Sequence, residues 1–577
     1  MFAKYFGCFV VLSLLSGFLR AQEPDQKEPE KAQRERFLIS QILADVPNLR
    51  LGENRAFVYA KVGTLSCHSA PQEILSLFQK AVAEILNSQE QAESGPKRPG
   101  SQSDLAMVQN SRSQILNLIA SCDAAFALDS LYRTRTAATA KAIAEAAAND
   151  TKPGRNGSIY NGTSQSELSL EQTLMRQAAA QDPEHAVKLI NDALKKGISS
   201  ETMQLLTQLS EKDPAAAQSA ASDVMNTLVR AKFIRDNQPN YQNMNTTVEI
   251  LSRYTNSDSA NQTLKFDDSQ IRDLAGNLVS FYIQQSERYG SYMVDPATMA
   301  RIAEKLVPSS VDALKQRQRT SVRNGGDNSE YNKLMSTPDA SPETLVNGAK
   351  RLPAAYRNVV YQNAAGKYVQ QGDLNRALAL LNENLSDDQL EQATISLKSQ
   401  YANTLMYAGK YTEAETMIDQ LPEYGRSIIL INLANTIYRA DPEKNKSYAL
   451  SVLGKARSLV SDQPENSTEF SNLMQVIIAY SDIAPDEAFR SFEPLVPQIN
   501  ELSDAYATVN QFQGGGNMRQ GEFPLSQGVS FGFYYDPSVF RLFAKNDFDR
   551  TMKLIDAFSR REIRLALLLY LAEYPNN

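Results

Sequence analysis

An Asp-Pro pair recurs along this chain, and it constrains the fold because it is a helix-start signature. The pairs begin at Asp182, Asp213, Asp295, Asp441 and Asp536. An aspartate can accept hydrogen bonds from the unpaired N–H groups of a first helical turn, and proline fits the first helical position because its N–H would have no partner there. Repeated caps in front of repeated apolar faces predict stacked helices. Capping alone accounts for these carboxylates, so none is a catalytic candidate.

Helical periodicity dominates the remainder of the sequence. Apolar residues recur at helical spacing through most of the 577 residues, whereas alternating apolar and polar runs with turn dipeptides are hard to find. A chain of this length exceeds one ordinary hydrophobic core. We therefore predict an all-α fold of helical hairpins stacked as an α-solenoid, with a separate N-terminal helical region.

Two stretches of the chain align with one another and describe a helix, a tight turn and a returning helix. In each, an alanine lets the first helix approach its partner closely, and a glycine ends that helix because it adopts a left-handed backbone at little cost. Thr412 and Glu415 have the spacing of a capping box. The matched residues are Ala365, Tyr368, Gly372, Leu374, Ala377 and Leu381 in the first stretch and Ala402, Leu405, Gly409, Tyr411, Ala414 and Ile418 in the second.

These residues resemble the tetratricopeptide repeat, which places a small residue, an aromatic, glycine, an aromatic and alanine at similar positions. The interval between the two stretches is longer than the ~34 residues of that repeat, and its early tryptophan and closing proline are absent. The resemblance covers about residues 364–421, with looser relatives at 168–228 and 433–459. It implies a non-catalytic scaffold that binds proteins or peptides on a concave surface.

Composition and loop signals divide the chain into segments. The linker at 151–167 contains three Gly turn pairs and few apolar residues. The predicted segments are a signal peptide at 1–21, a polar linker at 22–36, an N-terminal helical domain at 37–150, a flexible linker at 151–167, a helical-repeat region at 168–340, a tetratricopeptide-like repeat region at 341–510, a Gly/aromatic loop at 511–535 and C-terminal helices at 536–577.

The first residues are typical of a secretory signal. Lys4 supplies a positive charge, residues 5–19 are mostly apolar, and Ala21 is a small residue suited to cleavage, although Leu19 is bulky for its position. The alternative is an uncleaved anchor. No later segment reaches the ~20 apolar residues that a membrane span needs. We therefore expect an extracytoplasmic protein, periplasmic or secreted, with no membrane span after cleavage.

Two cysteines remain once the signal is removed. Cys67 and Cys122 both fall in the N-terminal helical region. In an exported chain they could form one disulfide, and the alternative is two buried thiols that act as small hydrophobic residues.

The sequence contains no recognisable catalytic, cofactor or metal site. Its two histidines, His68 and His185, lack the spacing of a metal site or of a metalloprotease, and no nucleophile elbow, Walker A loop or dinucleotide fingerprint is present. The net charge of −7 includes no broad basic excess, so nucleic acid is not an expected partner. We predict no catalytic residue, no cofactor and no metal.

One loop stands out because it is rich in glycine and aromatic residues. The loop could be a partner-binding insertion, since long ordered loops are often functional, or its aromatics could pack back onto neighbouring helices. The candidate residues are Phe523, Phe531, Phe533, Tyr534 and Tyr535.

These features together predict an exported, non-catalytic scaffold that binds a protein or peptide through a helical-repeat surface. Two alternatives stay open. A helical (α/α) extracytoplasmic enzyme would need a cleft lined by acids, His or Tyr, and a structural cell-envelope component would associate with itself. A deep pocket with facing carboxylates of perturbed pKa would favour the enzyme.

Overall fold

The computed structural model describes most of the chain. The described residues are 27–67, 71–94, 104–150, 162–231, 233–235, 238–256, 264, 266–289, 294–316, 329–337, 339–512, 518–528 and 537–573. The predicted signal peptide and most of the predicted linker at 151–167 lie outside them.

The described residues are almost entirely helical, as predicted. Strand structure among them is confined to a two-residue antiparallel hairpin, β1 with β2, and one isolated bridge. The first elements are α1 (Lys27–Asp45), η1 (Val46–Asn48), α2 (Gly52–Leu65), α3 (Pro71–Ser94), α4 (Asp104–Ala120), α5 (Ala124–Arg133), α6 (Ala137–Asp150), α7 (Gly162–Gln181), α8 (Ala186–Lys195), α9 (Thr202–Lys212), α10 (Pro214–Arg230), β1 (Ile234–Arg235), β2 (Gln238–Pro239), α11 (Tyr241–Asn256), α12 (Asp268–Tyr289), α13 (Pro296–Leu306) and η3 (Pro308–Ser310). The later elements are α15 (Ser329–Met335), α16 (Pro342–Ala349), α17 (Ala354–Gln370), α18 (Leu374–Asn384), α19 (Asp387–Tyr407), α20 (Tyr411–Ile418), α21 (Glu423–Ala440), α22 (Pro442–Ser458), α23 (Ser467–Ile483), α24 (Pro485–Phe492), α25 (Leu495–Phe512), η4 (Leu525–Gln527), α26 (Ser538–Asn546), α27 (Phe548–Asp556) and α28 (Arg561–Glu573).

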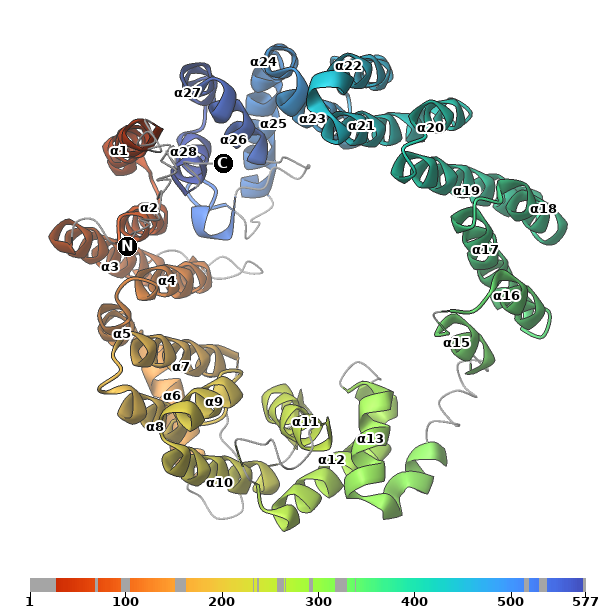
Figure 1. Cartoon of the computed structure of the whole chain (residues 1–577). Helices are drawn as coiled ribbons and strands as arrows, with labels where there is room; N and C mark the ends of the chain where they lie inside the picture. Colours follow the sequence, from red (N-terminus) through yellow and green to blue (C-terminus); the bar gives the residue numbers. More distant parts are fainter. Residues whose placement is uncertain are drawn as a thin grey trace, which may run out of the picture.

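The helices follow one another around a ring (Figure 1). From α16 to α25 they form two layers, with α17, α19, α21, α23 and α25 on the inner side and α16, α18, α20, α22 and α24 outside. From α16 to α25 each helix packs on the next in the chain, and the inner helices α17, α19, α21 and α23 also contact each other in succession. The first and last helices meet, because α28 packs against both α1 and α2. The predicted α-solenoid of helical hairpins is confirmed, and its two ends are joined.

The two best-aligned repeats are hairpins with the same turn. Gly372 and Gly409 both have a left-handed backbone, with φ of +86° and +74°. The residue after each glycine donates its N–H to a carbonyl five residues earlier, from Asp373 to Tyr368 at 2.9 Å and from Lys410 to Leu405 at 2.9 Å. This is the Schellman ending of a helix, which requires one residue with positive φ. The glycines therefore set both turns, as the sequence predicts.

Three of the five Asp-Pro pairs begin helices in the predicted way. Asp213, Asp295 and Asp441 are the N-caps of α10, α13 and α22, and each carboxylate accepts a backbone N–H of the first turn. Asp182 instead lies in the turn before α8, which begins at Ala186, and its carboxylate accepts the N–H of His185 at 3.2 Å. Asp536 is outside the described residues.

Two local expectations were wrong. The segment interpreted as a polar linker is helical from Lys27, because its Lys, Glu, Gln, Arg and Ala residues favour helix and Pro29 falls in the first turn. The predicted capping box at Thr412 and Glu415 does not form, since α20 has no side-chain cap. The Glu415 carboxylate bonds to the next repeat instead.

A tyrosine, a glutamate and a basic residue join neighbouring hairpins at two places. The hydroxyl of Tyr448 donates to Glu415 at 2.8 Å, and Lys455 pairs with the same carboxylate at 2.6 Å. Tyr368 and Arg376 contact Glu343 in the same way, at 3.0 and 3.1 Å. In each link, two side chains of one hairpin contact a glutamate of the preceding hairpin. The links therefore support the stacking of repeats.

The apolar core is continuous across the point where the ring closes. One cluster of buried residues joins Leu38 and Ile42 of α1 to Leu568 and Leu571 of α28. Further clusters cover α2 to α7, α7 to the end of the helix region near Leu314, and α16 to α19. The predicted N-terminal helical domain therefore shares a core with the C-terminal helices, while its boundaries stay a prediction.

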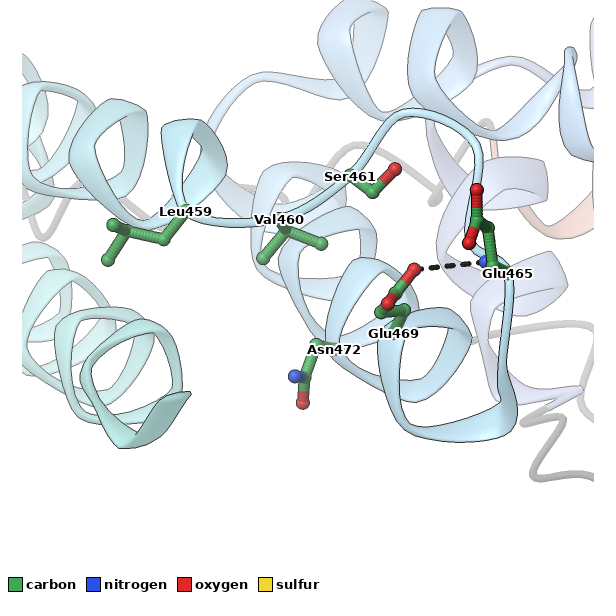
Figure 2. A pocket seen from close by; sticks show the side chains of 6 residues that line it. All are labelled: Leu459, Val460, Ser461, Glu465, Glu469 and Asn472. Atoms are coloured by element: carbon green, nitrogen blue, oxygen red, sulfur yellow. Dashed lines mark hydrogen bonds between the residues drawn. The ribbon is translucent and has the colours of Figure 1, made fainter. Parts of the chain in front are cut away.

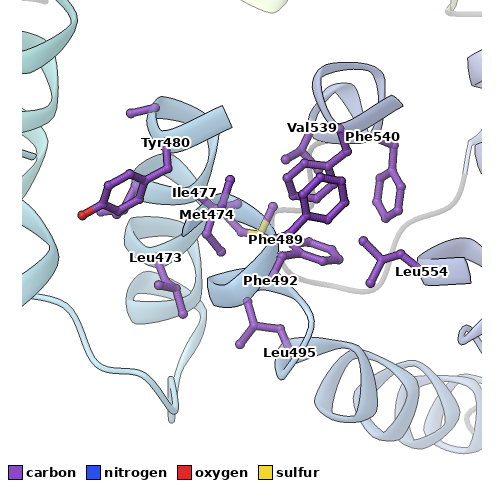
Figure 3. Packing of buried hydrophobic residues seen from close by; sticks show 14 of the residues in the cluster. Leu473, Met474, Ile477, Tyr480, Phe489, Phe492, Leu495, Val539, Phe540 and Leu554 are labelled. Atoms are coloured by element: carbon purple, nitrogen blue, oxygen red, sulfur yellow. The ribbon is translucent and has the colours of Figure 1, made fainter. Parts of the chain in front are cut away.

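Aromatic side chains form the centre of the C-terminal part of this core (Figure 3). Phe489 of α24 stacks on Phe543 of α26 with ring centroids 4.4 Å apart, and Phe492 meets Phe540 edge to face at 5.4 Å. Each fully buried phenylalanine contributes about 1.5–3 kcal/mol through burial alone. The rings fix α24 and α26 together, and so position α25 at the inner side.

Candidate binding surface

Four successive inner helices leave the same positions open to solvent. We align α17, α19, α21 and α23 on a residue that is fully buried in each, Ala365, Ala402, Ala434 or Ile477. Relative to it, the positions at −6, −2, +1 and +5 form four rows across the helices. The rows are Val359, Ser396, Ile428 and Ser471; Asn363, Gln400, Asn432 and Gln475; Gly366, Asn403, Asn435 and Ile478; and Gln370, Tyr407, Arg439 and Asp482.

We call these sixteen positions the inner face. All but Gly366 are exposed or half-exposed. Their spacing of four, three and four residues keeps them on one side of each helix. These four helices belong to the inner layer of the ring (Figure 1), and the inner face is a solvent-exposed side of that layer.

The inner face is uncharged across three of its four rows. Charged residues appear only in the fourth row, at Arg439 and Asp482, although 22% of the whole chain is charged. Exposed apolar side chains stand among the polar ones, including Val359 at 45% exposure and Tyr407 at 87%. The face therefore suits a ligand recognised by hydrogen bonds and apolar contact rather than by charge.

The next inner helix, α25, also exposes apolar side chains. Leu502, Val509 and Phe512 of α25 are exposed, and Phe512 is 91% exposed. They lie seven and three residues apart, which places them on one side of α25.

Two hollows open beside the loops that lead from an outer helix to the next inner helix. One, of about 350 Å³, lies between the end of α22 and the start of α23 and is lined by Leu459, Val460, Ser461, Glu465, Glu469 and Asn472 (Figure 2). Its Glu469 carboxylate accepts the backbone N–H of Glu465 at 2.9 Å and the side-chain amide of Asn466 at 2.7 Å. The carboxylate is thus occupied in capping α23.

The second hollow, of about 440 Å³, lies between α19 and the start of α21. Its charged side chains are of both signs, Glu391 and Asp419 against Lys398 and Arg426. Arg426 donates to the carbonyl of Leu421 at 2.7 Å. Neither hollow brings together a nucleophile, a base and a group that orients the base, which catalysis by a triad requires.

A buried ionic cluster stands on α7. Glu167 and Glu171 lie one turn apart, and both side chains are buried. Arg112 of α4 is 1% exposed, and two of its guanidinium nitrogens donate hydrogen bonds to the Glu167 carboxylate, at 2.8 and 3.1 Å. Arg135 contacts both carboxylates, at 2.9 and 2.8 Å. Buried charges need such partners to be tolerated, and here the set is complete.

The surroundings of Glu171 stabilise its charged form. Burial by itself would raise the pKa of Glu171, but hydrogen bonds from Lys196, Tyr132 and Arg135 outweigh that effect and lower its pKa below the ordinary value. Burial and the bond to Glu171 raise the pKa of the Tyr132 phenol. A general acid at neutral pH needs a carboxyl group with a raised pKa, whereas the pKa of Glu171 is lowered. We therefore interpret the cluster as a structural contact that joins α4, α7 and α8.

The ring closes through a carboxylate that caps a helix from the other end of the chain. α2 begins after Leu51, whose side chain cannot cap it. The Glu522 carboxylate accepts the backbone N–H of Arg50 at 2.7 Å and that of Leu51 at 3.0 Å, and it accepts the Asn54 amide at 3.3 Å. A negative group at the N-terminus of a helix is favoured by the unpaired N–H groups and by the helix dipole.

The loop that carries Glu522 is shaped for this contact. Arg519 and Glu522 form a bridge around a tight turn, in which Gln520 and Gly521 both have positive φ. Arg519 pairs with buried Glu53 of α2, and Arg560 of the segment before α28 donates to the carbonyl of Gly521. The residues at 518–528, which we call the closing loop, thus tie the start of α2 to the end of the chain.

The candidate site residues from the sequence have different positions. Cys67 and Cys122 are joined by a disulfide at the ends of α2 and α4, with Cα atoms 5.8 Å apart. Phe523 is 2% exposed and stacks on Tyr506 at 6.0 Å, so its ring contacts the protein's own helices. The remaining residues of the predicted partner-binding loop, Phe531, Phe533, Tyr534 and Tyr535, are outside the described residues.

His185 has a local role. Its ring lies 2.8 Å from the carboxylate of Asp182, three residues earlier, and both side chains are exposed. In the described part of the chain, no group of three or more His, Cys, Asp or Glu side chains is placed to hold a metal ion. None of the helices described combines the length and apolar character that a membrane crossing requires.

Comparison with known proteins places this chain in no family. No protein-family model and no curated protein sequence matches it. A solved chain described as a "circular tandem repeat protein with novel repeat topology and enhanced subunit contact surfaces" aligns over 94% of this chain and 97% of its own, at 11% identity and a TM-score of 0.14. A superposition that poor carries no argument, so the fold assignment rests on the helices themselves.

The first prediction concerns the closing loop. Replacing Glu522 by Gln removes the charge and turns one accepting oxygen into a donor that faces other donors. Hydrogen bonds to charged groups contribute about 1.5–3 kcal/mol, so we expect the backbone amides of Arg50 and Leu51 to exchange with deuterium roughly 30-fold faster. Glu501→Gln, on the exposed side of α25, is the control. Equal exchange in the two variants would contradict the capping role.

The second prediction concerns the pH dependence of the stability that Glu171 contributes. The pKa of Glu171 is lowered by folding, so the stabilisation it supplies is present above its ordinary value of 4.5 and is lost as the pH falls below that value. Glu171→Gln should lower the thermal midpoint at pH 7, and the difference from the wild type should shrink between pH 5 and pH 3, as measured by calorimetry. Glu211→Gln is an exposed control. A difference that does not change with pH would show that Glu171 is not charged in the fold.

Proposed function

We propose that this chain is an exported, non-catalytic scaffold that binds proteins or peptides on its inner face. One observation carries the proposal, namely that four successive inner helices expose the same four rows of side chains. A packed core explains why many of the intervening positions are buried, but it does not require an amide side chain to recur at the second row of all four helices. Repeat arrays bind partners on surfaces of this kind.

The tetratricopeptide resemblance supports the same function. The hairpins α17–α18 and α19–α20 share the buried alanine, the glycine turn and the second alanine on which it depends. The hairpin α21–α22 keeps the buried Ala434 but ends its first helix without a glycine. We propose that α17 to α22 are divergent tetratricopeptide-like units and that the neighbouring hairpins follow the same packing more loosely.

Export is supported by two features of the sequence and one of the structure. Residues 1–21 have the pattern of a signal peptide, and the later chain contains two cysteines. The bond between Cys67 and Cys122 suits an oxidising compartment, where disulfides persist. We propose a periplasmic or secreted location.

The enzyme alternative has less support. The ionic cluster on α7 contains facing carboxylates, but the pKa of Glu171 is lowered and its partners are complete. The two hollows beside the repeats are lined by capping groups and by opposite charges. We therefore propose binding rather than catalysis.

The third prediction tests the inner face with two matched variants. Ser396→Lys with Ser471→Lys adds two charges to the inner face, whereas Asn375→Lys with Ser451→Lys adds two charges to exposed positions of outer helices. We expect the wild type and the outer variant to retain the same proteins from the native extracytoplasmic fraction and the inner variant to lose them, because desolvating a charge opposes binding. Quantitative mass spectrometry of the captured proteins is the measurement.

Two results would contradict this proposal. If the inner variant retained every protein that the wild type retains, binding would not use the inner face. If the wild type retained no protein, the scaffold function itself would be wrong. Circular dichroism of both variants shows whether they fold alike.

The fourth prediction tests export. Protein isolated from its native host should begin at Gln22, and an alkylating reagent applied without reduction should leave Cys67 and Cys122 unmodified. Intact-mass spectrometry measures both. A full-length chain beginning at Met1 would contradict signal cleavage, and two alkylated cysteines in the folded protein would contradict the proposed oxidising compartment.

A further inference from the structure

The second row of the inner face consists entirely of side-chain amides. Asn363, Gln400, Asn432 and Gln475 occupy the equivalent position of α17, α19, α21 and α23. None of the four amides makes a hydrogen bond within the described part of the chain. An amide carries one acceptor and two donors, and these groups are therefore available to a ligand.

The molecule already uses such amides to hold polypeptide backbone. Asn54 donates to the carbonyl of Phe523 at 2.8 Å and accepts the N–H of Leu525 at 2.8 Å. Asn500 does the same with the carbonyl of Ala557 at 3.0 Å and the N–H of Ser559 at 2.9 Å. In both cases one side-chain amide pairs with the C=O of one residue and the N–H two residues later.

The amides of the second row lie on helices that pack directly together. The inner helices contact each other in order, and a Cβ placed on Gly366 of α17 would lie 3.1 Å from the Gln400 side-chain oxygen of α19. The Gln400 side chain of α19 therefore packs against Gly366, a third-row position of α17. Packed helices are about 8–10 Å apart, which sets the step from one amide to the next.

That step selects a backbone conformation for the ligand. A polyproline II helix rises ~3.1 Å per residue with three residues per turn, so equivalent backbone groups recur about every 9 Å on one side. In a β-strand the C=O and N–H groups of successive residues point to opposite sides. At a step of three residues, every second set of backbone groups would therefore point away from its amide. Within the segment that Asn54 holds, Pro524 has an extended backbone, with φ −67° and ψ 111°.

The charge of the surface agrees with this ligand. The rows on both sides of the amides carry no ionisable side chain, and Val359 and Ile428 supply exposed apolar contacts beside them. A polyproline II backbone has no internal hydrogen bonds and is uncharged, so its C=O and N–H groups are free for the amides.

We propose that the amide row binds a segment of about ten residues in the polyproline II conformation, with one amide for each turn of the segment. This inference rests on the proposed function and names its ligand class. The backbone supplies the hydrogen bonds, so the protein accepts many sequences that lack charge, and the apolar side chains of the first row contact the side chains of the segment.

The test uses a pool of random ten-residue peptides, acetylated and amidated at their ends, and binding is measured by fluorescence anisotropy on a peptide selected from the pool. Asn432→Leu with Gln475→Met removes two amides at similar side-chain size, and Asn375→Leu with Asn382→Leu makes comparable changes at exposed positions of α18. We expect the first pair to weaken binding at least about tenfold and the second pair to leave it within about threefold, because each lost backbone hydrogen bond weakens binding several-fold.

Peptide chemistry provides an independent readout. Methylation of a backbone nitrogen should weaken binding about tenfold at every third residue and much less at the residues between them. Unchanged binding by the variant that lacks the Asn432 and Gln475 amides, or equal effects of methylation at all positions, would overturn the inference. A pool without a binder would also overturn it, whereas the capture experiment with the lysine variants decides the proposed function separately.

Discussion

The cap that Glu522 places on α2 is the contact on which the architecture depends. An α-solenoid normally leaves both terminal repeats open, and each must cover its last apolar face with its own polar side chains. Here the buried residues of α1 and α28 cover each other, and the closing loop supplies the carboxylate that α2 lacks. The apolar contact buries most of the surface between the two ends of the chain. The Glu522 carboxylate fixes how the ends are aligned, because two backbone N–H groups must point at it together.

Closure also determines what the inner helices can do. A solenoid that is free at both ends changes its curvature by small rotations at each interface between repeats. Here α28 packs on α1 and α2, so the repeats next to this junction are held from both sides. The links from Tyr368 and Tyr448 to glutamates of the preceding hairpin resist the same movement. Together these contacts hold the rows of the inner face in register.

The hairpins could be predicted because their causes are local. Gly372 and Gly409 end helices by backbone conformation, and Asp213, Asp295 and Asp441 begin them by capping, so both effects act within a few residues. The contact between Glu522 and the start of α2 could not be predicted, because Glu522 and Leu51 are far apart in the chain. Neither residue belongs to a local sequence motif that would indicate the contact. Part of the amide row could be predicted, since Asn363 and Gln400 each lie two residues before the aligned alanines. The alignment did not extend to Asn432, because α21 lacks the glycine that ends α17 and α19.

The two kinds of amide in this molecule show how the fold and the proposed function are related. Asn54 is 1% exposed, and the backbone that it holds belongs to the closing loop. Asn363 and Asn432 are exposed, and their positions are fixed by helices whose other sides are buried. Side chains that are positioned before a ligand arrives lose less freedom on binding, which favours affinity without additional contacts. The links from Tyr368 and Tyr448 to the preceding hairpins hold the inner helices that carry these amides, and the proposed binding depends on that arrangement.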